Sequence, residues 1–193
     1  LWRGEPEKAL RALAMVPQDY FEEYAAQEPK GYLTGWAHKL AGRPTAATAE
    51  WRAALTLVEE RLKTDGRNFA LLTQRALLLA LTDQREAARA AWQLRVELGG
   101  SERPPGYESE AQVFLALDEP AQAIAAIERG WAKLSPTNRS TRLPSLRYHP
   151  AFAPIRDDPR IQRIISEATT LVQELKAAQT ALADFGVLSS IQV

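Results

Sequence analysis

Four short segments of the chain share one layout, and this repetition constrains the fold more than any other feature. Each begins with a turn-forming Gly or Asp, continues through polar residues or proline, and reaches an Ala five positions later. The turn residues lie 38, 41 and 35 positions apart, and periods of this size are typical of stacked helical hairpins. The segments are Gly4–Leu10, Gly42–Thr48, Asp83–Arg89 and Asp118–Ile124.

Helical periodicity flanks these turns on both sides. Between Pro44 and Lys63 the apolar residues recur every three or four positions, which predicts one buried helix face. The segments after the next two turns show the same pattern, and the short links between helices predict antiparallel hairpins. The partner helices are predicted at Lys30–Ala41, Asn68–Leu81 and Gly106–Leu117. A further short helix, outside the repeat, is predicted at Gln18–Gln27.

Small side chains recur at equivalent places in the paired helices. Each of the last three marked Ala residues has a Gly or Ala twelve positions before it, and a large apolar residue follows each of the four marked Ala residues by four positions. Small residues at both sites would let two helix axes approach closely. The small residues are Gly35, Ala76 and Ala111 on the first helices and Ala9, Ala47, Ala88 and Ala123 on the second. The large residues are Leu13, Trp51, Trp92 and Ile127.

This pattern resembles the tetratricopeptide repeat (TPR) over about residues 1–136. The resemblance implies an all-α, right-handed α-solenoid of antiparallel helical hairpins. The chain departs from the family pattern where Gly31 stands in place of the large residue that normally opens the first helix. The closing proline of each repeat survives only near Pro136.

The resemblance also implies a binding face, because first helices line the concave surface in this family. An aromatic residue with a nearby cation suits a peptide groove, so the face is expected to centre on Tyr32, Trp36 and Leu77. The alternative is that Tyr32 and Trp36 only cover the N-terminal helix. The matching concave positions are Tyr32, Trp36, Lys39, Thr73, Leu77, Glu108 and Gln112.

Other chemistry-bearing residues have simpler interpretations. Trp51, Trp92 and Trp131 fall on apolar stripes, which favours core packing over a ligand cage. His38 is expected to be partly buried and satisfied. The acidic pairs have no His, Lys or nucleophile at a useful spacing, so we expect no catalytic site. The alternative is that the chain is an enzyme that uses His38 or His149 in a cleft.

The composition limits the classes of partner that the chain is expected to bind. Lys plus Arg and Asp plus Glu both number 24, so no global field attracts nucleic acid or an anionic membrane. Six Arg oppose two Asp in residues 138–163, but no aromatic ladder accompanies them, which argues against nucleic acid. The longest apolar run, Ala76–Leu81, is too short to span a membrane. With no Cys and two His, neither a metal site nor a cofactor is expected.

The C-terminal part predicts a cap for the repeats. Asp158 followed by Pro159 is a helix-start signal, and an apolar face then continues toward a stop at Gly186. His149 before Pro150 predicts a second helix start, and Tyr148, Phe152 and Ile155 are expected to be buried. Such a helix would cover the last apolar face of an open solenoid. It could also pair with a second chain, as could the tail at 187–193, so self-association is an alternative function.

Residues 146–165 also resemble the closing segment of repeat regions in bacterial multidomain signalling proteins. The chain opens without Met, and we expect it to be part of a larger protein. The expected organisation is a single domain over 1–193, with repeats at 1–136, a capping segment at 137–158 and a C-terminal helix and tail at 159–193. The expected function is protein or peptide binding, as a cytoplasmic, non-catalytic scaffold or regulatory module of a signalling or transcription-regulating protein.

Overall fold

The computed structural model describes residues 4–23 and 26–184, and the chain divides into two compact units. One unit spans Leu1–Gly130 and the other spans Trp131–Val193, and each is described by itself. The sequence predicted a single domain whose repeats end near residue 136, whereas the boundary between the units falls after Gly130. Both units are mostly helical, which confirms the all-α class.

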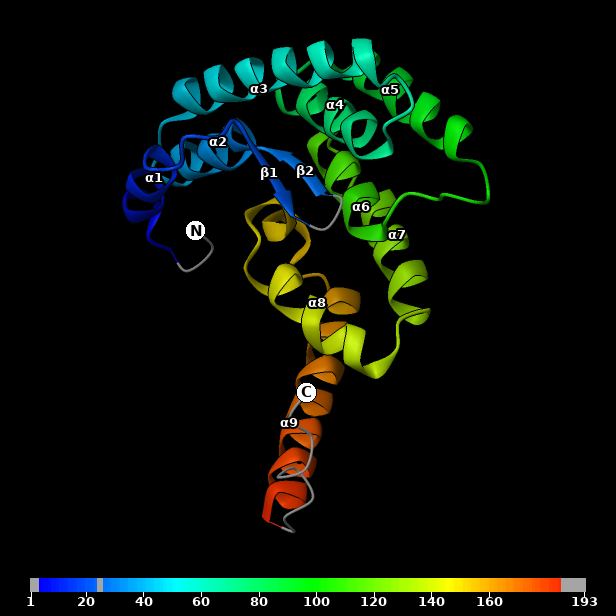
Figure 1. Ribbon diagram of the computed structural model, residues 1–193. Coiled ribbons are helices and arrows are strands. Elements are labelled where there is room, and N and C mark those ends of the chain that lie inside the picture. The colour runs from blue at the N-terminus through cyan, green and yellow to red at the C-terminus, as the bar shows by residue number, and fades with distance from the viewer. Residues whose placement is uncertain (1–3, 24–25, 185–193) are drawn as a thin grey trace. The chain divides into compact units, whose positions relative to one another are not determined.

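Neighbouring antiparallel helices pack in pairs in the first unit (Figure 1). Helix α2 packs on α3 and α4 packs on α5, as the predicted hairpins require, and α3 also contacts α4. The helices of this unit are α1 (Pro6–Ala14), α2 (Lys30–Leu40), α3 (Pro44–Thr64), α4 (Phe69–Leu81), α5 (Arg85–Gly99), α6 (Tyr107–Ala116) and α7 (Pro120–Ala132, which crosses into the second unit). The strands are β1 (Tyr20–Glu23) and β2 (Ala26–Pro29).

The four predicted turn residues all adopt the left-handed backbone conformation. Their φ angles are 79° at Gly4, 73° at Gly42, 62° at Asp83 and 63° at Asp118. In the last three turns the residue after the turn residue donates its N–H to a carbonyl five positions earlier, as in a Schellman helix end. One such bond joins the Glu119 N–H to the Phe114 carbonyl at 2.8 Å. At Gly42, Asp83 and Asp118 the repeat in the sequence is therefore a repeat of helix stops.

Asp118 offers a direct test of this turn chemistry. We expect Asp118→Gly to raise the free energy of unfolding by about 0.5–1 kcal/mol, because Gly adopts positive φ without a steric penalty. Asp118→Val should lower it by about 1–2 kcal/mol, because a β-branched residue is strained there. Urea unfolding measures both changes. Asp65, whose φ is −131°, is the control: a stabilising Asp65→Gly would contradict the explanation.

Six of the seven small residues predicted at the helix crossings are buried in the core, whereas Ala9 on α1 is half-buried, as is the large residue Leu13. Gly35, Ala76 and Ala111 on the first helices are buried, as are Ala47, Ala88 and Ala123 on the second helices. The large residues Trp51, Trp92 and Ile127 are buried as well. The helices approach closely at Gly35, because a Cβ built on it would lie 2.2 Å from Nε1 of Trp51. The predicted packing of these hairpins is confirmed at these positions.

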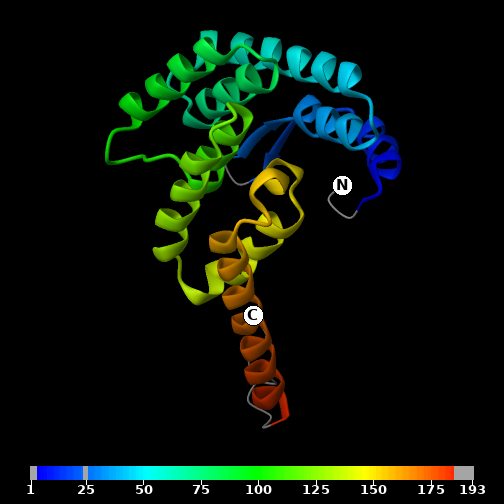
Figure 2. The ribbon, with the colours of Figure 1, turned by 180° about the vertical axis from the view of Figure 1, so that it is seen from behind.

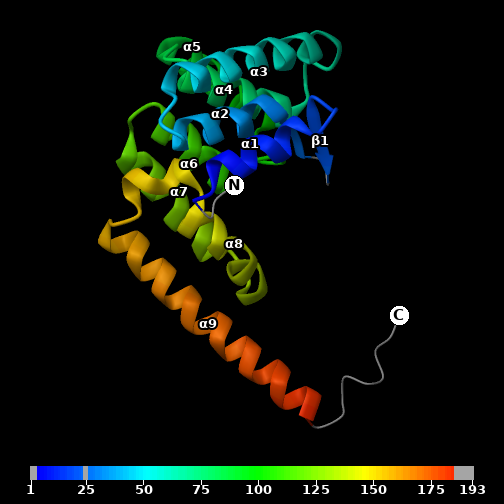
Figure 3. The same ribbon diagram turned by 90° about the vertical axis from the view of Figure 1, so that its left-hand side faces the viewer.

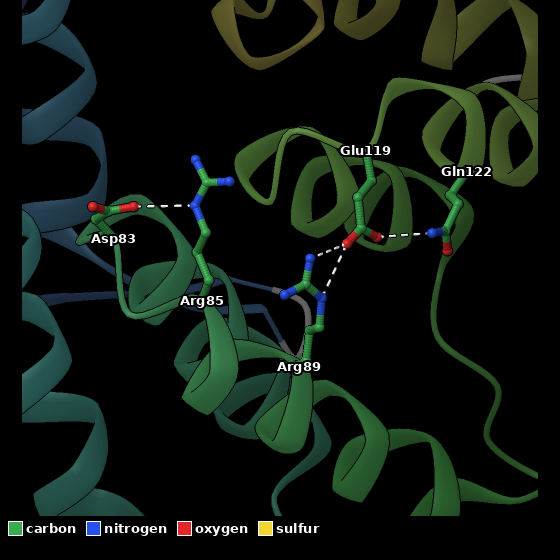
Figure 4. Close-up of polar contacts among 5 residues, drawn as sticks. All are labelled: Asp83, Arg85, Arg89, Glu119 and Gln122. Atoms are coloured by element: carbon green, nitrogen blue, oxygen red, sulfur yellow. Dashed lines mark hydrogen bonds and ion pairs between the residues drawn. The ribbon is translucent and has the colours of Figure 1, made fainter.

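Ion pairs join the second helix of one hairpin to the turn of the next. Arg89 on α5 donates from Nε to Oε1 of Glu119 at 3.0 Å, and Gln122 donates to the other oxygen of Glu119 at 2.9 Å (Figure 4). Glu7 on α1 accepts from Nη2 of Arg43 at 2.5 Å. Arg43 and Glu119 both directly follow a left-handed turn residue, so the same junction recurs with the charges reversed. Each pair is exposed on at least one side and contributes modestly to stability.

The predicted helix at Gln18–Gln27 is wrong, because the structure places a β-hairpin there. Strands β1 and β2 pair antiparallel with Tyr20 opposite Pro29 and Phe21 opposite Glu28. The adjacent aromatic residues favour a strand. The hairpin lies against the helices of the first unit, and β2 contacts α2, α3 and α4 (Figure 2).

The second unit contains α8 (Pro136–Tyr148), a short 3-10 helix η1 (Pro150–Ile155) and α9 (Pro159–Asp184). Helix α9 packs on α8 and runs unbroken along its length (Figure 3). Its first half buries Ile161, Ile164, Ile165 and Ala168. The predicted stop at Gly186 and the tail at 187–193 lie outside the described residues.

Both predicted helix starts are confirmed in the second unit. Nδ1 of His149 accepts the Ala151 N–H at 3.1 Å, and Oδ1 of Asp158 accepts the Arg160 N–H at 2.9 Å. Phe152 and Ile155 are buried as predicted. The predicted burial of Tyr148 is wrong, because its side chain is 54% exposed.

Helix geometry explains the exposure of Tyr148. It ends α8, two positions after the buried Leu146, and residues two apart in a helix point away from each other. Helix α8 itself was not predicted from the sequence. Its start was detectable, because Ser135 precedes Pro136 and its hydroxyl accepts the Asn138 N–H at 3.3 Å.

No helix within the described residues is both long enough and apolar enough to cross a membrane.

Candidate functional site

The structure places the centre of the predicted binding face in the core. Tyr32, Trp36 and Leu77 retain only 1%, 5% and 3% of their surface. The Tyr32 hydroxyl on α2 donates to Oε1 of Gln112 on α6 at 2.9 Å, so two predicted site residues do meet. They meet in a partly buried hydrogen bond between two helices. A partner cannot reach this centre in the conformation seen here.

An aromatic cluster with a cation at its margin surrounds Trp36. The Trp36 ring lies edge-on to Tyr32 and to Trp51, with centroid separations of 6.5 and 5.5 Å. The Trp51 Nε1–H donates to the Tyr32 carbonyl at 3.2 Å. Nζ of the exposed Lys39 lies 4.9 Å from the centre of a Trp36 ring. The predicted pairing of an aromatic residue with a cation exists, but the aromatic residue serves mainly as core.

The remaining predicted residues have local partners. The Thr73 hydroxyl donates to the Phe69 carbonyl at 2.8 Å and accepts from Nε of Arg95 at 3.2 Å. Glu108 accepts from the Tyr107 hydroxyl at 3.3 Å. Thr73, Glu108 and Gln112 are half-buried. Of these contacts only the one between Thr73 and Arg95 joins two helices, α4 and α5.

A carboxyl group that the sequence analysis missed lies beside this cluster. Glu28 is on β2, and burial raises its pKa to about 7. Burial also raises the pKa of the Tyr32 hydroxyl, and the nearby Glu28 carboxylate adds to that increase. Glu28 was not recognised as a candidate because a helix was expected at 18–27. Only a hairpin at this place brings Glu28 toward α2.

An open groove of about 630 Å³ lies between β1 and α3. Its apolar surface includes Phe21 and Leu57, and the Arg61 guanidinium carbon lies 3.5 Å from the centre of the Tyr20 ring. The Tyr20 hydroxyl is buried and has no hydrogen-bond partner among the described residues. The residues that line the groove are Gln18, Asp19, Tyr20, Phe21, Leu57, Glu60 and Arg61.

The outer edge of β1 can accept another strand. The Lys30 N–H donates to the Asp19 carbonyl at 2.7 Å, at the end of the β1–β2 register. Hydrogen-bonded and non-hydrogen-bonded pairs alternate along antiparallel strands, so the backbone groups of Tyr20 and Glu22 point outward. At the outer edge of β2, opposite Tyr20, stands Pro29, which has no N–H to offer. The edge beside the groove is therefore the one better suited to strand addition.

The two histidines have different surroundings. The side chain of His149 is 8% exposed, and the centre of its ring lies 5.7 Å from the centre of the Phe152 ring. Burial, together with the charge of Arg156, lowers its pKa to about 4. His38 is half-buried as predicted, but its Nδ1 is buried without a hydrogen-bond partner among the described residues, so it is not fully satisfied. Within those residues no cluster of three or more His, Cys, Asp or Glu could hold a metal ion.

Comparison of the chain with protein-family models, with curated proteins and with solved structures finds no match.

Proposed function

We propose that the chain is a TPR-like module that binds an extended peptide segment of a partner protein. In this proposal it is a non-catalytic, cytoplasmic scaffold or regulatory part of a larger bacterial signalling or transcription-regulating protein. The binding surface is the groove between β1 and α3, in place of the buried positions around Trp36. The repeated helix stops and the paired helices support the repeat architecture.

Among the described residues β1 pairs with no strand other than β2, and its outer edge beside the groove is the observation that carries the proposal. An added strand would gain main-chain hydrogen bonds from the outward groups of Tyr20 and Glu22. Alternate side chains of that strand would reach the groove, where Phe21 and Leu57 offer apolar contact. Gln18, Asp19, Glu60 and Arg61 add polar groups that can select among sequences.

Proline substitutions on the two edges of the hairpin test this site. Peptides would be selected from a random display library on the purified chain, and their affinities measured by fluorescence anisotropy. We expect Glu22→Pro to weaken binding by about tenfold or more, because it removes an outward N–H and blocks approach to the edge. Gln27→Pro is the matched control, because Gln27 lies opposite Glu22 on the other edge.

The outcomes separate clearly. Strand addition at β1 is supported if the selected peptides bind the Gln27→Pro variant as tightly as the wild type and bind the Glu22→Pro variant more weakly. Equal affinities for both variants, with circular dichroism showing both folded, would place binding elsewhere. A library from which no peptide binds above background would overturn the proposed function.

A further inference from the structure

We infer that Arg95 and Arg103 form a binding site for an oxyanion, a phosphate or carboxylate group. Arg95 lies on α5, and Arg103 lies in the loop between α5 and α6. The site is separate from the groove beside β1, so the inference does not depend on the proposed peptide binding.

The two guanidinium groups share one aromatic ring. The central carbon of the Arg95 guanidinium lies 4.6 Å from the centre of the Phe69 ring, and that of Arg103 lies 5.5 Å from it. Phe69 is the first residue of α4, whose N-terminal end contributes a partial positive charge nearby. Two like charges are thus gathered around a single residue.

Arg95 is buried, and it has no carboxylate partner in the described part of the chain. It is 5% exposed, and its hydrogen bonds run from Nε to the Thr73 hydroxyl at 3.2 Å and from Nη1 to the Arg103 carbonyl at 3.0 Å. Both acceptors are neutral. Nη2 has no acceptor among the described residues, yet it is not one of the fully buried polar atoms. A donor therefore remains available at the solvent boundary.

No carboxylate in the described part of the chain forms an ion pair with either arginine. The nearest acidic residues in the sequence, Glu97 and Glu102, are exposed, and Glu97 accepts from Gln93 at 2.8 Å. Arginine keeps its charge at any ordinary pH, and buried charges in proteins are normally paired. An external anion would supply the missing partner.

The backbone is shaped to hold this arrangement. A Cβ added to Gly99 would lie 2.5 Å from Nη1 of Arg95, so the absence of a side chain leaves room for the guanidinium. Gly100 has φ 51°, and the Arg103 N–H donates to the Gly99 carbonyl at 3.0 Å, which turns the loop back over α5. The planar fork of arginine matches the oxygens of phosphate and carboxylate groups.

The site is tested by titrating the whole chain with inorganic phosphate. The titration is monitored by NMR through the Arg Nε–H signals. Sodium chloride of matched ionic strength is the blank, and acetate distinguishes carboxylate from phosphate recognition. We expect a saturable shift of the Arg95 Nε–H signal with one or both anions. Arg103→Gln should weaken that binding by about tenfold or more, because a charged donor is lost. Arg52→Gln, an exposed arginine on α3, is the matched control and should leave binding unchanged.

Folding is controlled separately. Arg103 is exposed, so Arg103→Gln should keep the fold, and Arg95→Lys keeps the charge while it removes the planar fork. In Arg95→Lys the titration is followed at the Arg103 Nε–H signal, and weaker binding at an unchanged circular dichroism spectrum supports recognition by the fork. Linear, unsaturated shifts, or equal effects of Arg103→Gln and Arg52→Gln, would overturn the inference and leave Arg95 as a structural tie between α4, α5 and the loop. Glu22→Pro should leave the anion response intact, which keeps this result distinct from the peptide test.

Discussion

Gly35→Ala is expected to lower the free energy of unfolding by about 2–3 kcal/mol, because extra atoms in a packed core force neighbours to shift. The added Cβ would lie 2.2 Å from Nε1 and 2.5 Å from Cδ1 of Trp51. Trp51 is 4% exposed and donates its Nε1–H to the Tyr32 carbonyl. The indole therefore cannot move away without losing a buried hydrogen bond. Urea unfolding followed by circular dichroism measures the change.

A double-mutant cycle with Trp51→Ala shows whether this contact is the cause. Alanine lacks the whole ring that the new Cβ would meet, so Gly35→Ala should cost much less in the Trp51→Ala background. Gly66→Ala is the matched control, because a Cβ there meets only the Leu62 carbonyl at 3.5 Å. An equal cost of Gly35→Ala in both backgrounds would show that the destabilisation has another origin.

The paired helices and the stops between them were predictable because their determinants are local. A residue at positive φ must be Gly or a tolerant residue such as Asp, so the helix stops leave their identity in the sequence at Gly42, Asp83 and Asp118. Close helix crossings likewise demand small residues, which marked Gly35 and Ala47. Both requirements act at fixed distances along the chain, so spacing alone recovers them.

The burial of the expected binding face was less predictable, because the exposure of a helix face depends on what lies over it. The helical periodicity placed Tyr32 and Trp36 on one side of α2, but it gave no sign that this side is covered. The β-hairpin that contacts α2 and α4 was expected to be a helix. Two short strands are stabilised by pairing with each other and by these helices, and single-sequence patterns carry little of that information.

The arginine site did leave a signal in the sequence. Arg95 falls on the same stripe of α5 as the buried Ala88 and Trp92, and Gly99 continues the stripe. A charged residue on a buried helix face requires partners. The spacing therefore indicated a buried cation, but only the structure shows Arg103 and Phe69 beside it.

Glu28 should make the stability of the first unit depend on pH. Burial raises the pKa of its carboxyl group from 4.5 to about 7 in the folded state. Between these two values the folded chain holds a proton that the unfolded chain has released, so stability falls as pH rises through this window. A shift of this size corresponds to a loss of about 3 kcal/mol above pH 7.

The whole-protein pH profile hides this effect, because His149 opposes it. Its pKa is lowered to about 4, so its contribution to stability rises with pH between about 4 and 6.5. The comparison of Glu28→Gln with the wild type removes the His149 contribution from the difference.

We expect the two proteins to have similar unfolding free energies at pH 4.5, and the variant to be more stable by about 3 kcal/mol at pH 8. Glu128→Gln, a change at an exposed carboxyl on α7, is the control and should track the wild type. Urea unfolding at both pH values measures the difference, and a pH-independent difference between Glu28→Gln and the wild type would show that Glu28 ionises normally in the folded chain.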